Sequence, residues 1–165
     1  MRFNFILFLF FCAGITQGQH SNPFFSLNYD KVIMYDFESE EADPNIIRSD
    51  GQLAKKIHRQ VTLNTAVISA LYKKLEDPSS FGGGTRNCYI PHLGIVYYLK
   101  NVPVAQINIC MDCNRIFSNL PLLGKKYGRI YTGAASYYLK DDGMSKSFRH
   151  FLTKLLKEKN FSHRE

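Results

Sequence analysis

The chain has 165 residues, of which 45% are hydrophobic, 21% charged and 14% aromatic, and its formal net charge is +7. That length suits one globular domain, and the aromatic content excludes an intrinsically disordered chain. The 11 glycines and 6 prolines follow no period, which excludes collagen-like and low-complexity classes. Four cysteines are too few for a small protein held together mainly by disulfides.

Residues 1–18 have the pattern of a secretory signal peptide. Arg2 gives a positive start, residues 3–11 are almost wholly apolar, and small residues ending at Gly18 predict cleavage after that position. The apolar run is shorter than the roughly 20 residues that a membrane-spanning helix needs. We therefore expect an exported protein, periplasmic or secreted, in which residues 19–165 form a single domain.

Cleavage at this position leaves the domain with an odd number of cysteines. Cys12 belongs to the leader, so Cys88, Cys110 and Cys113 remain. Because an oxidising compartment pairs cysteines, one thiol must stay free, pair with another chain or bind a ligand. Lipid attachment at Cys12 is an alternative, disfavoured because the bulky Phe11 precedes it where such processing prefers a small residue.

The first half of the expected domain predicts two strands, a helix and a connector. Residues 29–37 and 56–63 are rich in β-branched and aromatic side chains at alternating positions, which is typical of strands. Asn64 is a suitable N-cap, and apolar residues spaced by three or four predict a helix to about Glu76. The glycine-rich segment 79–85 is interpreted as a flexible connector, since neither a Lys-Ser/Thr pair nor a helix follows it.

The second half predicts a hairpin, a further strand and a second helix. Residues 89–99 and 104–109 form the two expected strands of the hairpin, and residues 129–140 predict one more short strand. Ser145 caps a final amphipathic helix that extends to about Lys159. The expected fold class is therefore α+β: a small antiparallel sheet containing a central hairpin, packed with two amphipathic helices.

The residues with distinctive chemistry flank this hairpin. Cys88 and His92 precede its turn, and Cys110 and Cys113 follow it at similar distances, so the two pairs converge at one end of the sheet. Zinc prefers four tetrahedral ligands drawn from thiolate and imidazole groups, often as two short-spaced pairs. The sequence therefore predicts a metal site, with zinc as the expected ion, on Cys88, His92, Cys110 and Cys113. Because four protein ligands leave no open position on the metal, we expect the site to have a structural or sensory role.

The register of the hairpin decides whether two of these ligands share a face. A three-residue loop at 101–103 pairs Lys100 with Val104 and places His92 and Cys110 on the same face as diagonal neighbours. A two-residue loop shifts the pairing by one and places them on opposite faces. The four-ligand hypothesis thus depends on a register that the pattern leaves open.

Two other interpretations of the cysteines remain. Cys110 and Cys113 have the Cys-x-x-Cys spacing of thiol–disulfide redox proteins, with Cys88 as a third thiol. The plainer alternative is one ordinary disulfide and a buried free cysteine within a basic binding module. The sequence contains neither a Gly-x-Ser-x-Gly nor a His-Glu-x-x-His motif, so an enzyme is not the favoured class.

The charge of the last predicted helix is the main indication of which partners the protein could bind. Residues 145–165 contain six Lys or Arg and two acidic residues, so this helix could contact an anionic surface or an acidic protein. The regular apolar stripe favours a simpler interpretation, in which the charges solvate the outer face of a core helix. Nucleic acid is not an expected partner, because the chain is predicted to be exported and its positive charge is modest.

Two segments of the chain resemble a known group of proteins. They are Cys88-Tyr-Ile-Pro-His92-Leu-Gly-Ile-Val-Tyr-Tyr and Ile107-Asn-Ile-Cys110-Met-Asp-Cys113-Asn114. This pattern resembles small exported bacterial proteins of unknown function that share a Cys-x-x-x-His strand, a hairpin and a strand ending in Cys-x-x-Cys-Asn. The resemblance covers about a quarter of the chain and implies no established activity.

Overall fold

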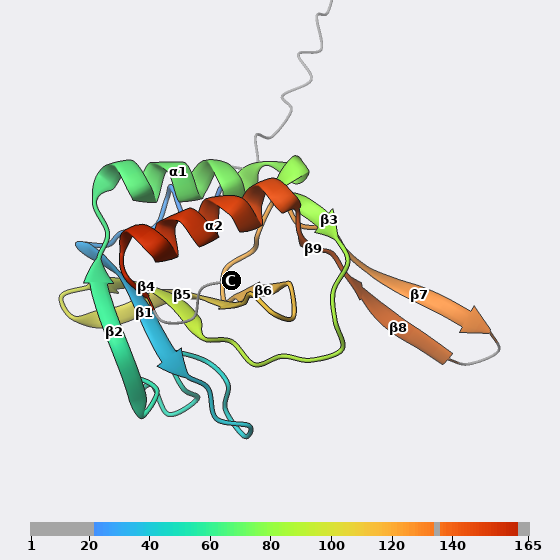
Figure 1. Cartoon of the computed structure of the whole chain (residues 1–165), viewed down its shortest axis with the longest axis horizontal. Helices are drawn as coiled ribbons and strands as arrows, with labels where there is room; N and C mark the ends of the chain where they lie inside the picture. Colours follow the sequence, from blue (N-terminus) through green and yellow to red (C-terminus); the bar gives the residue numbers. More distant parts are fainter. Residues whose placement is uncertain (1–21, 134–135, 162–165) are drawn as a thin grey trace, which may run out of the picture.

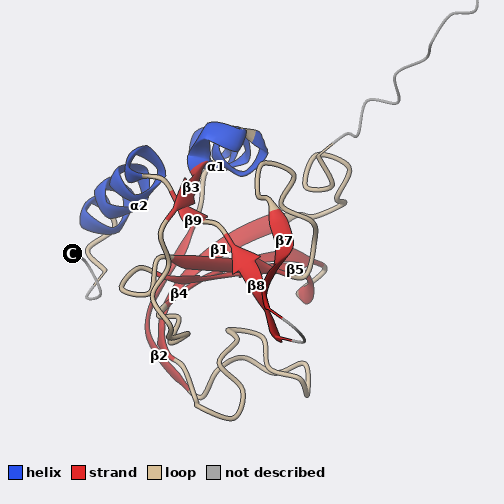
Figure 2. Cartoon of the chain, turned by 90° about the vertical axis from the view of Figure 1, so that its right-hand side faces the viewer, coloured by secondary structure: helices blue, strands red, loops and turns tan. Residues whose placement is uncertain are grey.

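A five-stranded sheet with strand order β2-β1-β4-β5-β6 forms the centre of the computed structural model, and every neighbouring pair is antiparallel. Two helices lie over one face of this sheet (Figures 1 and 2). The fold is therefore α+β, as predicted. The structure describes residues 22–133 and 136–161, so the expected leader at residues 1–18 lies outside the described residues.

The elements follow one another in a simple order along the chain. The sheet is formed by β1 (Lys31–Glu38), β2 (Lys56–Thr62), β4 (Leu93–Leu99), β5 (Val102–Cys110) and β6 (Arg115–Ser118). The helices are α1 (Thr65–Glu76), the short 3₁₀ helix η1 (Pro78–Ser80) and α2 (Lys146–Glu158). The remaining strands are β3 (Phe81–Gly83), β7 (Tyr127–Gly133), β8 (Ser136–Asp141) and β9 (Gly143–Met144).

Both helices begin where their caps were predicted. The Asn64 side chain accepts a hydrogen bond from the backbone N–H of Val67 at 3.0 Å, which satisfies a donor in the first turn of α1. At α2, the Ser145 hydroxyl accepts from the N–H of Phe148 at 3.4 Å. Pro78 follows the last residues of α1 and cannot continue that helix.

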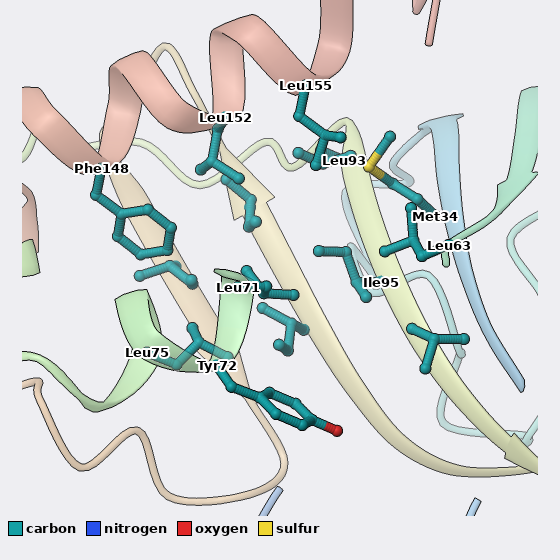
Figure 3. Packing of buried hydrophobic residues seen from close by; sticks show 14 of the residues in the cluster. Met34, Leu63, Leu71, Tyr72, Leu75, Leu93, Ile95, Phe148, Leu152 and Leu155 are labelled. Carbon is teal, nitrogen blue, oxygen red and sulfur yellow. The ribbon is translucent and has the colours of Figure 1, made fainter. Parts of the chain in front are cut away.

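The helices bury their apolar stripes on one face of the sheet. Leu71 from α1 and Phe148 and Leu152 from α2 are fully buried and lie beside Ile95 of the central hairpin (Figure 3). Ile107 of the same hairpin belongs to this cluster. Each such side chain contributes about 1.5–3 kcal/mol through removal from water. This cluster is the main core of the domain.

The loop between β1 and β2 covers the opposite face. Its fully buried Ile46 packs over Gly94, where an added Cβ would lie 2.6 Å from the Ile46 side chain. The backbone N–H of Ile46 donates to the Asn108 side chain at 2.7 Å. The hydroxyls of Tyr35 and Tyr98 hydrogen-bond each other at 2.7 Å on this face. Each face of the sheet therefore carries its own apolar cluster.

The register of the β4–β5 hairpin differs from both registers considered from the sequence. The turn consists of residues 100–101, with φ of 51° and 66°, which is the conformation of a two-residue type I′ turn. A shift in the pairing between Tyr97 and Tyr98 then moves the register by one, so Gly94 pairs with Asn108. The sequence-based pairings were wrong because they assumed regular pairing past Pro103, which lies at the shift, and proline within a strand is typical of edges and bulges.

The region after β5 also contains more strand than predicted. Residues 129–140 were expected to form one strand, but they belong to two strands, β7 and β8, which pair as a separate ribbon that projects from the rest of the chain (Figure 1). The aromatic residues in both strands suggested one continuous strand, although Gly133, a residue typical of turns, could have indicated that the first strand ends there. The predicted flexible connector contributes β3, which pairs with β9.

Candidate functional site

The three cysteines of the expected domain meet at one end of the sheet. Cys110 is the last residue of β5, Cys113 lies in the turn before β6, and Cys88 lies between β3 and β4. Their Sγ atoms all lie within 4.8 Å of one another. Cys110 and Cys113 are buried, whereas Cys88 is half-buried. The structure thus brings together three of the four predicted metal ligands.

A tight turn places the second and third cysteines side by side. The backbone N–H of Cys113 donates to the Sγ of Cys110 at 3.1 Å, and the N–H of Asn114 donates to the carbonyl of Met111 at 3.2 Å. Asn114 has a φ of 52°, a left-handed conformation that Asn adopts more readily than most residues. The chain then reverses into β6, where Arg115 pairs with Cys110.

One side-chain and one backbone hydrogen bond dock the segment that carries Cys88 onto this turn. The Asn114 side-chain amide donates to the carbonyl of Gly84 at 2.8 Å, and the N–H of Arg86 donates to the carbonyl of Cys113 at 3.0 Å. The proximity of Cys88 to the other two cysteines therefore depends on the turn residue Asn114 as well as on the hairpin.

His92 lies just before β4 and is held by β1 and β5. Its backbone N–H donates to the carbonyl of Ile109 at 3.2 Å, and its own carbonyl accepts from the N–H of Phe37 at 3.0 Å. Its ring Nδ1 lies 3.2 Å from the carbonyl oxygen of Phe37. One further step of the β4–β5 register places His92 opposite Cys110. Among the described residues, however, the group of mutually close ligand atoms contains the three sulfurs and not the His92 nitrogens.

Cys113 holds the central position among the sulfurs. Its Sγ lies within bonding distance of the sulfurs of both Cys88 and Cys110. The Cα separations are 5.6 Å to Cys88 and 5.2 Å to Cys110, and both values suit a disulfide. Because one sulfur forms only one disulfide, these two bonds are alternatives. Three reduced thiolates around a metal ion are the third arrangement that the geometry allows.

A cavity of about 480 Å³ borders the site on the side of Cys88. Its volume falls in the range of pockets that take small molecules. Within it, the Glu40 carboxylate is paired with Lys55 at 2.9 Å, so one of its two acidic groups is compensated. The cavity is lined by Ser39, Glu40, Glu41, Cys88, Tyr89 and Ile90.

Sequence reasoning missed two contributors to this site. The cavity-lining residues 39–41 lie nearly fifty positions before Cys88, and no local pattern joins the two segments. Asn114 was noted only as part of a motif, although Asn directly after Cys-x-x-Cys was a usable signal for a left-handed turn residue. Both omissions concern contacts made across the fold rather than within one element.

Comparison of the chain with protein family models, with curated proteins and with solved structures finds no match in any of the three. In the part of the chain that the structure describes, no helix is both long and apolar enough to cross a membrane. The geometry of the cysteine cluster is therefore the main indication of function.

Proposed function

We propose that Cys88, Cys110 and Cys113 bind one zinc ion as thiolates, in a structural or sensory site of an exported protein. The observation that carries the proposal is the mutual proximity of the three sulfurs, all within 4.8 Å. Thiolates bound to tetrahedral zinc at about 2.3 Å lie about 3.8 Å from one another. To reach that arrangement, the sulfurs of Cys88 and Cys110 would move away from the Cys113 sulfur, since both lie within bonding distance of it.

The surroundings of the sulfurs support thiolate ligands. The N–H of Cys113 already points to the Sγ of Cys110, and hydrogen bonds of this kind stabilise negative charge on sulfur. Cys110 and Cys113 are each only 1% exposed, and buried thiolates need a compensating positive charge. A zinc ion supplies that charge and protects the odd thiol from oxidation.

In this proposal His92 supplies the fourth ligand through Nε2. An Nδ1–H that donates to the Phe37 carbonyl leaves the lone pair of the neutral ring on Nε2. Metal-bound histidines commonly use their other nitrogen in this way. The register supports the assignment because it sets His92 opposite Cys110, and binding would require the ring to move toward the sulfurs.

Metal content is the first test. The full chain, expressed with its own leader and purified without chelator, is expected to hold about one zinc per chain. Cys113→Ser should abolish binding, whereas Asp112→Ala, a change at the exposed neighbour, should retain it. His92→Ala should weaken binding without abolishing it, because three thiolates remain. A metal-free protein containing one disulfide and one free thiol would contradict the proposal.

The location of the protein and its kinship belong to the same proposal. The pattern of residues 1–18 supports export, and the Cys-x-x-x-His and Cys-x-x-Cys-Asn segments support kinship with small exported bacterial proteins. Peptide mass spectrometry of the protein recovered from the periplasm or the culture medium tests the first part. An N-terminus at Gln19 is expected, and an intact leader on protein recovered from the cytoplasm would argue against export.

A disulfide-based redox function is the second candidate. It is favoured by the position of Cys113, whose Cα separations from Cys88 and Cys110 both suit a disulfide. The Cys-x-x-Cys spacing predicted a redox pair of Cys110 and Cys113, and the structure adds Cys88 as a second possible partner of Cys113. Thiol titration alongside the metal measurement separates the two candidates, because zinc binding preserves all three thiols and a disulfide removes two.

A further inference from the structure

The three clustered sulfurs differ in their access to solvent. Cys110 and Cys113 are each 1% exposed, whereas Cys88 is half-buried and borders the 480 Å³ cavity. Thiol–disulfide exchange requires the attacking sulfur to approach a disulfide sulfur directly. A molecule that enters from solvent therefore meets Cys88 before either of the other two cysteines.

The position of Cys113 supplies the second half of an exchange reaction. Its sulfur is buried and lies within bonding distance of the Cys88 sulfur. A mixed disulfide formed at Cys88 would therefore have an internal thiol beside it. Reactive cysteines of redox-sensing sites are characteristically accessible and placed next to such a resolving cysteine.

We infer that Cys88 is a reaction site for small disulfide molecules that enter this cavity, and that Cys113 resolves the product. The Cys88 thiolate attacks one sulfur of the disulfide RSSR, forms the mixed disulfide with RS, and releases RS⁻. The Cys113 thiolate then attacks the Cys88 sulfur, forms the Cys88–Cys113 disulfide, and releases the second RS⁻. Two thiolates of the protein are oxidised and one RSSR is reduced to two RS⁻.

Cys110 can then accept the oxidation internally. Attack of the Cys110 thiolate on the Cys113 sulfur forms the Cys110–Cys113 disulfide and releases the Cys88 thiolate. The oxidised pair would thereby become fully buried while Cys88 returns to the cavity. The reaction needs reduced cysteines but no metal, so it does not rest on zinc binding. Where zinc is bound, formation of the disulfide releases it.

Cystamine is a suitable probe because it is a small symmetric disulfide. The reduced protein, with the expected leader and its Cys12 removed on export, is mixed with cystamine both as purified and after chelator treatment, and the products are mapped by peptide mass spectrometry. In a Cys110→Ser/Cys113→Ser variant, we expect the adduct to accumulate on Cys88. Cys88→Ser should react at least tenfold more slowly than the unmodified chain, whereas Cys110→Ser should still react at Cys88 and form the Cys88–Cys113 disulfide.

A matched pair of tryptophan variants tests the role of the cavity. Ser39→Trp places a large side chain at the lining of the cavity and should slow the reaction several-fold, whereas Ser69→Trp, on the exposed side of α1, should not. Circular dichroism checks that each variant is folded. An adduct mapped first to Cys110 or Cys113, or an unchanged rate in folded Cys88→Ser, would overturn the inference. Zinc content is measured separately, so failure of the metal proposal would be recognised independently.

Discussion

The helix-covered face of the sheet and its cysteine end are stabilised in different ways. The first is a cluster of large apolar side chains spread over several elements, in which residues such as Leu71, Ile95 and Phe148 are fully buried. The second is built from three sulfurs, one Asn with a left-handed backbone conformation and a few hydrogen bonds. The comparison shows that the core sets the positions of the strands, whereas a small number of specific contacts sets the positions of the reactive groups.

The largest expected effect is in the core. Phe148→Ala should lower the free energy of unfolding by about 3–5 kcal/mol, because it removes a fully buried ring and leaves a cavity. Urea denaturation measures the loss. Phe151→Ala, at a partly buried position on the same helix, is the control and should cost clearly less. Equal costs at the two positions would show that α2 does not pack through the face described here.

The cysteine end should respond according to which arrangement it adopts. If zinc is bound, Ser substitutions at Cys88, Cys110 and Cys113 should each release the metal and lower stability by similar amounts. If a disulfide forms instead, Cys113→Ser should cost most. The chain-entropy relation gives about 3.5 kcal/mol for the Cys88–Cys113 link, whose sequence separation is 25. Cys88→Ser and Cys110→Ser would each leave one alternative disulfide, so unequal costs would count against zinc.

Substitutions of the turn residue Asn114 should lower stability by a smaller amount, which can be separated into a side-chain and a backbone contribution. Asn114→Gly removes the amide that binds Gly84 and Met144 but keeps the left-handed backbone accessible. Asn114→Ala removes the same hydrogen bonds and adds about 1–2 kcal/mol of backbone strain at a φ of 52°. Chemical denaturation should therefore show that the Ala variant is less stable than the Gly variant, and that both are less stable than the protein with Asn114. A Gly variant as unstable as the Ala variant would assign the whole effect to the amide.

The smallest effect at neutral pH concerns the tyrosine pair on the other face. Burial raises the pKa of Tyr35, with a further contribution from its hydrogen bond to Tyr98, and burial also raises the pKa of Tyr98. Because the folded state holds both groups neutral, their stabilisation is complete below the ordinary tyrosine pKa of about 10. It is lost as the pH rises above that value, since the unfolded chain ionises first.

Alkaline unfolding measures this contribution. Stability should fall by up to about 1.4 kcal/mol per pH unit for each buried tyrosine. The Tyr35→Phe/Tyr98→Phe variant should be about 1 kcal/mol less stable at neutral pH, because it lacks the hydrogen bond between the two hydroxyls. Its stability should then decline less steeply as the pH rises. A decline of unchanged slope would indicate that these two hydroxyls are solvated in the folded state.

The same division explains how much the sequence could predict. The Asn64 and Ser145 caps and the apolar periodicity of both helices are local signals, so the positions of the helices were predicted closely. The convergence of the three cysteines was also predictable, because Cys110 and Cys88 lie at similar distances from the hairpin turn. These inferences need only short stretches of chain.

Features that depend on contacts between distant segments could not be predicted. The irregular pairing beside Tyr97 changed the register of the hairpin; Pro103 lies at this irregularity, but it does not fix the new pairing by itself. His92 lies outside the group of sulfurs, and its ring contacts Phe37, which lies 55 residues away in sequence. The cavity at Cys88 requires the loop after β1 to pass beside it, a contact that local patterns do not encode.

The central claim is that three thiolates converge on one zinc ion, and the zinc X-ray absorption spectrum of the purified full chain tests it most directly. The account predicts a first shell of three sulfurs at about 2.3 Å and one nitrogen at about 2.0 Å. The nitrogen should be lost or replaced by oxygen in His92→Ala while the sulfur shell remains. A protein that binds no zinc, or one whose zinc has fewer than three sulfur ligands, would contradict the account.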